Sequence, residues 1–211
     1  MNIGIIGAGM IGGTLGELWH AAGHAICFGT RHPQALDALV ASLGTRVSVA
    51  RPVDAATFGE VVLLAVPLRA APDVGRDVAS ALAGKVLMDA GNAYFQRDGQ
   101  LATDATQTPD GSSAWVASHF PGARVVKAFN TVYFKVLREK ARAGAAAPGV
   151  PIAGDDPGAV ELVARLVRDA GFNPVMVGPL AAGKRFEPGT PVYNTGMNAT
   201  QVAAELARSP R

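Results

Sequence analysis

The sequence predicts an α/β fold in which a doubly wound parallel sheet carries helices on both faces and ends in a short C-terminal extension. Short runs of β-branched and aliphatic residues alternate with segments whose apolar residues recur at helical spacing. Residues 61–66 are apolar without interruption, which is typical of a strand buried on both faces of a parallel sheet. Because 211 residues suit one larger α/β domain better than two, we expect a single domain over residues 1–211, with its core at 1–180 and a tail at 181–211.

The first third of the chain predicts strands and helices in regular alternation. The strands are expected at residues 2–7, 25–29, 47–49 and 61–66, and the helices at about 11–22, 33–43 and 52–58. Gly23 ends the first helix as a C-terminal cap, and Pro33 falls in the first turn of the second, where a helix accepts proline. The strand at 61–66 is expected at the centre of the sheet because it is apolar throughout.

The rest of the chain continues the alternation, with two interruptions. We expect helices at about 70–82, 113–120 and 157–170, and strands at 85–89, 124–128 and 174–177, joined by right-handed crossovers. Residues 141–148 are rich in Ala, Gly and Pro, and the sequence leaves open whether they form a mobile loop near a substrate or a plain surface excursion. The tail after Leu180 mixes Gly, Pro and polar residues before a weak helix near 199–207.

Composition excludes several classes of function. Lys and Arg number 19 against 17 Asp and Glu, and since no basic run stands out, nucleic acid is not expected as a partner. Cys27 is the only cysteine, which excludes an internal disulfide framework and a multi-cysteine metal site and favours the reducing cytoplasm. The longest apolar run is far short of the roughly 20 residues that a membrane helix needs, so no membrane association is expected.

A glycine motif follows the first predicted strand. Its spacing is G-x-G-x-x-G, formed by Gly7, Ala8, Gly9, Met10, Ile11 and Gly12. Between a strand and a helix, Gly7 allows the tight turn, Gly9 lets the backbone approach a pyrophosphate, and Gly12 permits close packing of the helix. The free N–H groups at the helix N-terminus would bind the pyrophosphate, as in the Rossmann dinucleotide-binding unit. The alternative is a glycine-rich turn without a ligand.

The end of the second strand indicates which dinucleotide is bound. An NAD-binding protein carries an acidic residue there for the ribose hydroxyls, whereas this chain has Thr30 and Arg31, followed by His32 and Pro33. Arg31 can pair with a 2′-phosphate and stack on the adenine, and Thr30 can donate a hydrogen bond. NADP(H) is therefore preferred over NAD(H). The alternative for Arg31 is a solvated surface arginine, and His32 is expected to be a bystander.

Three further loops are expected at the cofactor, because ligands of open parallel sheets bind beyond the carboxyl ends of the strands. Their candidate residues are Ala65, Val66, Pro67 and Leu68 after the fourth strand, Asn92 after the fifth, and Ala128 and Asn130 after the sixth. Pro67 would stiffen the wall of the pocket. Asn92 and Asn130 could orient the nicotinamide or the partner ring, or could equally be turn residues.

No metal site and no side-chain nucleophile are expected. The four histidines lack metal-ligand spacing, and no serine lies in a nucleophile-elbow motif. Hydride transfer between two rings requires neither, because it depends on holding the donor and acceptor carbons in contact and keeping water out.

Further motifs give the chain a family resemblance. They are Val-Val-Lys-Ala-Phe-Asn-Thr at 125–131, Ala-Gly-Asp-Asp at 153–156 and Gly-Pro-Leu at 178–180. Together with the glycine motif, Thr30-Arg31 and Ala65-Val66-Pro67, they resemble the NADPH-dependent reductases of the deazaflavin coenzyme F420, from Met1 to about Leu180. The resemblance implies NADP(H) as cofactor, hydride transfer to or from coenzyme F420, and a second ring near the loops of Asn130 and Leu180.

The tail departs from the family pattern and leaves the electron acceptor open. Some members continue into a longer apolar helix that helps to shape the deazaflavin pocket and a dimer contact, so the resemblance also implies that a homodimer can form. Here residues 183–194 are instead rich in Gly, Pro and polar side chains. The alternatives are an NADPH-dependent flavin or ferric reductase and a non-catalytic NADP-sensing module. A hydroxyacid or imine dehydrogenase is not expected, since it would need a substantial helical domain after Leu180.

Overall fold

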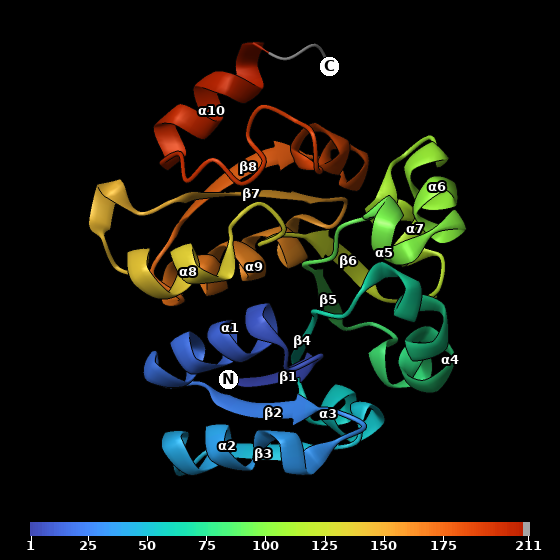
Figure 1. Cartoon of the computed structure of the whole chain (residues 1–211), viewed down its shortest axis with the longest axis vertical. Helices are drawn as coiled ribbons and strands as arrows, with labels where there is room; N and C mark the ends of the chain where they lie inside the picture. Colours follow the sequence, from blue (N-terminus) through green and yellow to red (C-terminus); the bar gives the residue numbers. More distant parts are fainter. Residues whose placement is uncertain (209–211) are drawn as a thin grey trace.

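The computed structural model describes residues 1–208 as a layered α/β molecule built on one eight-stranded sheet, in the order β3-β2-β1-β4-β5-β6-β7-β8 (Figure 1). The strands are β1 (Asn2–Ile6), β2 (Ala25–Gly29), β3 (Val47–Ala50), β4 (Val61–Leu64), β5 (Val86–Asp89), β6 (Arg124–Lys127), β7 (Gly149–Gly154) and β8 (Asn173–Gly178). The strands β1 to β6 are mutually parallel, and β4 lies at the centre as predicted. The predicted α/β Rossmann-like fold is therefore confirmed.

Helices cover both faces of the sheet (Figure 1). They are α1 (Met10–Ala21), α2 (Asp37–Leu43), α3 (Pro52–Phe58), α4 (Ala71–Leu82), α5 (Phe95–Asp98), α6 (Gln100–Gln107), α7 (Ser112–Ala117), α8 (Phe134–Lys140), α9 (Pro157–Asp169) and α10 (Ala199–Arg208). Residues of α1, α8 and α9 share one buried apolar cluster with the sheet, and residues of α3, α4, α6 and α7 share another on the opposite face. Each cluster takes alternate residues of the central strands, as the two-residue period of a strand requires.

The sheet is mostly parallel, as predicted, with one antiparallel pairing that the sequence did not indicate. Strand β7 runs antiparallel to β6 and parallel to β8. The sequence does not reveal β7 as a strand because it carries Pro151 between glycines, and proline cannot donate to a ladder. The structure tolerates Pro151 since the β6–β7 ladder includes only two residues of β7, Ala153 and Gly154.

Several predicted boundaries are also corrected. The strand expected at 61–66 ends at Leu64, and the helix expected at 113–120 ends at Ala117. Helices α5, α6 and α8 were not predicted. Residues 142–146 of the predicted loop at 141–148 are exposed and do not line the cavity described below, which favours the surface excursion.

The tail packs against the last two strands. Phe186 and Val192 lie with Val202 and Leu206 of α10 in a small apolar cluster that includes Ala153 of β7. The weak helix predicted near 199–207 is α10, and the last three residues of the predicted tail, 209–211, lie outside the described residues. The tail therefore covers one face of β7 and β8 and approaches the ends of the central strands.

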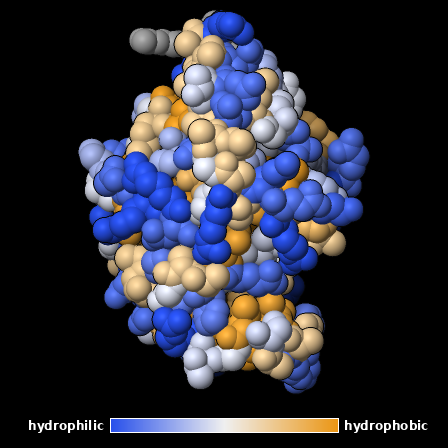
Figure 2. Space-filling model, turned by 90° about the vertical axis from the view of Figure 1, so that its left-hand side faces the viewer, coloured by the Kyte–Doolittle hydropathy of each residue, from blue (hydrophilic) through white to orange (hydrophobic). Residues whose placement is uncertain are grey.

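The surface of one side of the molecule is mixed in character. Figure 2 shows hydrophilic and hydrophobic side chains interspersed over this face. In residues 1–208, no helix combines the length and the apolar character needed to cross a membrane.

Candidate functional site

The turn between β1 and α1 requires glycine at two positions and leaves the third open. Gly7 has a φ of +98°, and a Cβ there would lie 2.5 Å from the carbonyl oxygen of Ala65. A Cβ on Gly12 would lie 2.0 Å from the carbonyl oxygen of Gly7. A Cβ on Gly9 would meet no atom within 4 Å. Gly7 and Gly12 thus fix the turn against β4 and α1, whereas the side of Gly9 is open to a ligand.

The N-terminus of α1 is free to bind an anion. Gly9 is its N-cap, and no side chain caps the helix. The first N–H groups of a helix have no partner within it, and the helix dipole makes this end positive. With the open side of Gly9 beside it, this turn fits a pyrophosphate group.

A pocket of about 480 Å³ follows the ends of β2 and β3. Three predicted residues line it, namely Thr30, Arg31 and Pro33, together with Arg51 and Asp77. Among residues 1–208 the exposed Arg31 has no hydrogen-bond or ion-pair partner. The Thr30 hydroxyl accepts a hydrogen bond from the His32 N–H at 3.0 Å, so its own proton is available to a ligand.

Arg51 was not predicted as a site residue. Gly29 is the register partner of Ala50, and the Thr30 N–H donates to the Ala50 carbonyl oxygen at 3.0 Å, so the residues that follow β2 and β3 lie side by side. Arg51 bonds Asp54 at 2.8 Å and is otherwise solvated. Two arginines therefore flank this pocket. The sequence signal was an arginine two residues after the third predicted strand.

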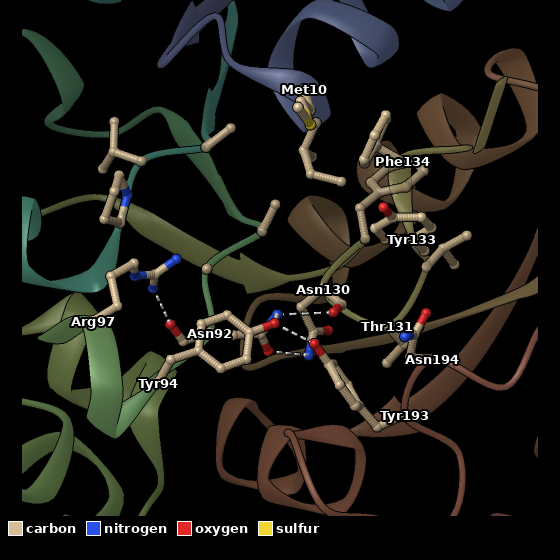
Figure 3. A pocket seen from close by; sticks show the side chains of 18 residues that line it. Met10, Asn92, Tyr94, Arg97, Asn130, Thr131, Tyr133, Phe134, Tyr193 and Asn194 are labelled. Atoms are coloured by element: carbon tan, nitrogen blue, oxygen red, sulfur yellow. Dashed lines mark hydrogen bonds between the residues drawn. The ribbon is translucent and has the colours of Figure 1, made fainter. Parts of the chain in front are cut away.

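A second cavity of about 300 Å³ lies at the point where the strand order reverses, beyond the ends of β1, β4, β5 and β6 (Figure 3). It brings together seven of the predicted residues: Met10, Ile11, Ala65, Val66, Pro67, Asn92 and Asn130. Gly7, Ala8, Gly9 and Gly12, at the turn from β1 into α1, line neither this cavity nor the Arg31 pocket. His32 lines neither cavity.

Three predicted residues lie in the core instead of at the cavity. Leu68 begins the short 3₁₀ turn before α4 and packs inward, and Ala128 is fully buried behind the end of β6. Leu180 also packs into the apolar cluster, while its N–H donates to Asp155 Oδ1 at 2.9 Å. This bond joins the Gly-Asp-Asp and Gly-Pro-Leu motifs, which indicates that both hold the tail.

Asn92 and Asn130 position the loops of the cavity. Asn92 Nδ2 donates to the Asn130 carbonyl oxygen at 2.9 Å, and Asn130 Nδ2 donates to the Phe186 carbonyl oxygen at 2.9 Å and to Asn92 Oδ1 at 3.1 Å. Because main-chain carbonyls only accept, these bonds fix the orientation of both amides. The pair therefore fastens the loop after β5 to the loop after β6 and to the tail.

The tail supplies a wall of the cavity that the sequence did not reveal. Tyr193 meets Tyr94 through their hydroxyl groups, and the Asn194 N–H donates to the Thr131 carbonyl oxygen at 3.0 Å (Figure 3). Burial raises the pKa of Tyr193 well above its usual value, so its hydroxyl stays protonated. Tyr193 lies in an irregular segment between glycines, where no periodicity marks it.

Arg97 stands beside the tyrosines. Its guanidinium lies 4.8 Å from the centre of the Tyr94 ring, donates to the Asn92 carbonyl oxygen at 2.7 Å and pairs with Asp98 at 2.8 Å. The Asp98 side chain is fully buried while that of Arg97 is one-third exposed and lines the cavity. The positive partner of this ion pair therefore faces the ligand space.

A buried polar cluster lies behind the cavity. Lys127 Nζ donates to Ser113 Oγ at 2.8 Å and lies 3.7 Å from both Asp89 Oδ2 and Glu187 Oε1. Asp89 in turn accepts from the Gly91 N–H at 2.8 Å, and Gly91 lines the cavity. Lys127 is fully buried and outside the cavity, so the cluster ties the tail to the ends of β5 and β6.

Comparisons with known proteins agree with this geometry. Residues 2–93 match the family model described as NADP oxidoreductase, coenzyme F420-dependent. The metalloreductase STEAP3 of Rattus norvegicus is 30% identical over 186 residues, which make up 88% of this chain and 36% of that protein. The chain spans about a third of the length of the curated relatives it matches.

Two solved structures are similar to this chain over most of its length. Protein SMa0349 of Sinorhizobium meliloti is 33% identical, with a TM-score of 0.78 and 94% of both chains covered. A protein of Arthrobacter sp. FB24, provisionally named an F420-dependent NADP reductase, is 26% identical, with a TM-score of 0.73 and 86% of both chains covered. Over residues 2–93, the chain is thus similar to the NADP oxidoreductases described as coenzyme F420-dependent, in agreement with the motifs and the fold described above.

Proposed function

We propose that this chain is an oxidoreductase that binds NADP(H) beyond the carboxyl ends of β1 to β6 and exchanges a hydride between the nicotinamide and a ring acceptor of the deazaflavin type, coenzyme F420. One observation carries the proposal. The pocket flanked by Arg31 and Arg51, the open turn at Gly9 and the cavity bordered by Met10 follow one another along this edge of the sheet. They match the order of the 2′-phosphate, the pyrophosphate and the nicotinamide in the dinucleotide.

The preference for NADP(H) follows from charge. Arg31 and Arg51 offer two guanidinium groups, and the Thr30 hydroxyl offers a further donor, where a 2′-phosphate would lie. Charge-assisted hydrogen bonds to phosphate are stronger than neutral ones. Asp77 also lines this pocket, and its carboxylate would accept a hydrogen bond from the adenine amino group.

The residues of the cavity would contribute by positioning. When bound, NADPH supplies the hydride, and transfer needs the two reacting carbons about 3–3.5 Å apart. Met10, Ile11, Val66 and Pro67 give the cavity an apolar wall that would exclude water. Its volume of about 300 Å³ lies at the lower end of the range for ligand sites.

A second candidate function is NADPH-dependent reduction of a flavin or a ferric chelate. The 30% identity with the metalloreductase STEAP3 favours it. Both candidates share the nucleotide site and differ only in the acceptor. The buried single thiol of Cys27 is compatible with the cytoplasm, where we expect the protein to act, and a homodimer stays a prediction for size-exclusion chromatography to test.

The experiment follows the oxidation of NADPH with coenzyme F420, flavin mononucleotide and a ferric chelate, side by side. We expect the fastest turnover with the deazaflavin. Faster turnover with the flavin or the ferric chelate would select the second candidate. Tight binding of NADPH without turnover would instead identify a non-catalytic NADP-sensing module, and absence of NADPH binding would reject the nucleotide site itself.

A further inference from the structure

One hydroxyl proton of the Tyr94–Tyr193 pair has no hydrogen-bond acceptor among residues 1–208. Asn92 Nδ2 reaches the Tyr94 hydroxyl at 3.4 Å, so this oxygen accepts one bond, and the Tyr94 and Tyr193 hydroxyls share a second. Two hydroxyls carry two protons, and the bond between them uses one. Whichever tyrosine donates in that bond, the other proton has no acceptor among residues 1–208. Both tyrosines line the cavity.

The positive charge of Arg97 lies on the same wall. Its Nε and one terminal nitrogen bond Asp98 and the Asn92 carbonyl oxygen, whereas the other terminal nitrogen has no partner in the described part of the chain. The carboxylate of Asp98 is buried behind it. The wall therefore presents a hydroxyl donor and a cationic donor together.

This wall faces the side of the cavity by which the nucleotide would enter. Figure 3 shows Met10, which follows the Gly9 turn, at one end of the cavity and the Tyr94–Tyr193 pair at the other. An oxidised nicotinamide ring is cationic, so the guanidinium of Arg97 does not favour it as a neighbour. A ring that receives a hydride gains negative charge instead, and donors aimed at developing charge stabilise it.

We propose that Tyr94, Tyr193 and Arg97 form the binding site for the electron-accepting ring and donate to the conjugated carbonyl oxygen where negative charge gathers. This inference rests on the proposed function. In the reaction, the C–H bond of the reduced nicotinamide breaks, a C–H bond forms on the acceptor ring, and both electrons of the old bond pass to that ring. The acceptor is thus a planar ring whose hydride-accepting carbon is conjugated to a carbonyl group, and its added charge is kept or neutralised by a solvent proton.

The test compares the affinities of the nucleotide-free protein for oxidised and reduced coenzyme F420, with flavin mononucleotide as a second ring. We expect the reduced ring to bind about tenfold more tightly than the oxidised one, the preference that one or two charge-assisted hydrogen bonds provide. The Tyr94→Phe/Tyr193→Phe double variant should lose most of this preference, because only Arg97 is left to donate. At saturating NADPH, the kcat of the double variant should fall about tenfold, with a smaller change in its KM for coenzyme F420.

The single variants serve as matched controls. Tyr94→Phe and Tyr193→Phe each leave one hydroxyl group whose proton has no acceptor within the protein. Each single variant should therefore retain most of the preference for the reduced ring. Cooperative thermal unfolding of all three variants would show that the chain still folds.

Three results would overturn the inference. They are equal affinity of the unmodified protein for the two redox forms, the same preference in the double variant, and a loss in that variant of NADPH affinity alone. If NADPH binds but neither ring does, the acceptor site proposed here fails while the nucleotide site stands. If NADPH itself does not bind, the proposed function fails.

Discussion

Individual glycines at the β1–α1 turn have different tasks, although they belong to one motif. Gly7 and Gly12 are needed by the fold, because a Cβ at either would meet main-chain atoms at 2.5 or 2.0 Å. Gly9 has a φ of −74° and open space around it, so the fold itself does not require glycine there. A need for glycine at position 9 would therefore come from a ligand, and binding of the proposed pyrophosphate would create one.

This difference predicts opposite results for two substitutions. Gly12→Ala should lower the free energy of unfolding by about 1–3 kcal/mol, because the new methyl group has no room. Gly9→Val should leave stability nearly unchanged but abolish NADPH binding by blocking the approach to the backbone. Urea unfolding and calorimetric titration measure the two effects. Tight NADPH binding by Gly9→Val would count against the pyrophosphate site.

The two arginines at the ends of β2 and β3 predict the cofactor preference. Arg31→Ala should weaken NADPH binding about tenfold or more and NADH binding much less, because NADH lacks the 2′-phosphate and loses only the stacking on its adenine. Arg51→Ala should have a smaller effect in the same direction, since Asp54 already pairs with this side chain. Equal affinity of the unmodified protein for NADPH and NADH would refute the pocket assignment.

Asp98 predicts a dependence of stability on pH. Burial opposes its charged form, yet the hydrogen bonds from Arg97 and from the Tyr94 and Arg69 N–H groups outweigh burial and lower the pKa of this carboxyl. A lowered pKa in the folded state contributes stability above the unfolded pKa of about 3.9, and this contribution is lost as the pH falls through the folded value.

Asp98→Asn should therefore reduce stability at neutral pH by about 1–3 kcal/mol and show a smaller further loss below about pH 4 than the unmodified protein. Urea unfolding across this range measures both. Asp110→Asn, at an exposed position, is the control. Identical pH profiles for the Asp98 variant and the unmodified protein would contradict the assigned role.

At the scale of elements, the sequence predicts best where periodicity and burial agree. The strands β1, β2, β4, β5 and β6 and the helices α1, α3, α4 and α9 lie close to their expected ranges, because each combines an apolar face with a clear Gly or Pro boundary. Helix α5 has only four residues, too few for a period to emerge, and α8 begins without the proline that marks the equally short α3. Strand β7 contains a proline that only its two-residue ladder with β6 permits.

The same limits apply to the candidate site. The residues on the loops after β1, β2 and β4 were predicted, because those loops follow recognisable strands. Tyr94, Arg97 and Tyr193 were missed. Tyr94 caps the short helix α5, Arg97 lies within that helix, and Tyr193 lies in the irregular tail. Tertiary contacts alone bring them to the cavity.

The buried cluster around Lys127 predicts how the tail is held. Lys127→Leu would leave Asp89 and Glu187 buried without their cationic partner, and should lower the free energy of unfolding by about 3–5 kcal/mol. Glu187→Gln should weaken the attachment of the tail. We expect faster amide hydrogen exchange in residues 180–186 and in α10, with less change elsewhere. Lys135→Gln, at an exposed position on α8, is the control. Unchanged exchange in the Glu187 variant would contradict this role of the cluster.

At the scale of the whole molecule, the proposed nucleotide site and the proposed acceptor site both lie beyond the carboxyl ends of the parallel strands. The N-terminal strands carry the turn and the arginines proposed for the nucleotide, on elements with many main-chain hydrogen bonds. The loops after β5 and β6 and the tail carry the wall proposed for the acceptor, fastened by Asn92, Asn130 and the Lys127 cluster. If both proposed sites are right, variation of the tail would alter the acceptor site and leave the nucleotide site unchanged.

The most direct test of this account is a crystal structure of the protein with NADP⁺. We predict the pyrophosphate at the N-terminus of α1 beside Gly9, the 2′-phosphate between Arg31 and Arg51, and the nicotinamide in the cavity next to Met10. A dinucleotide bound elsewhere, or bound with its 2′-phosphate away from both arginines, would contradict the account.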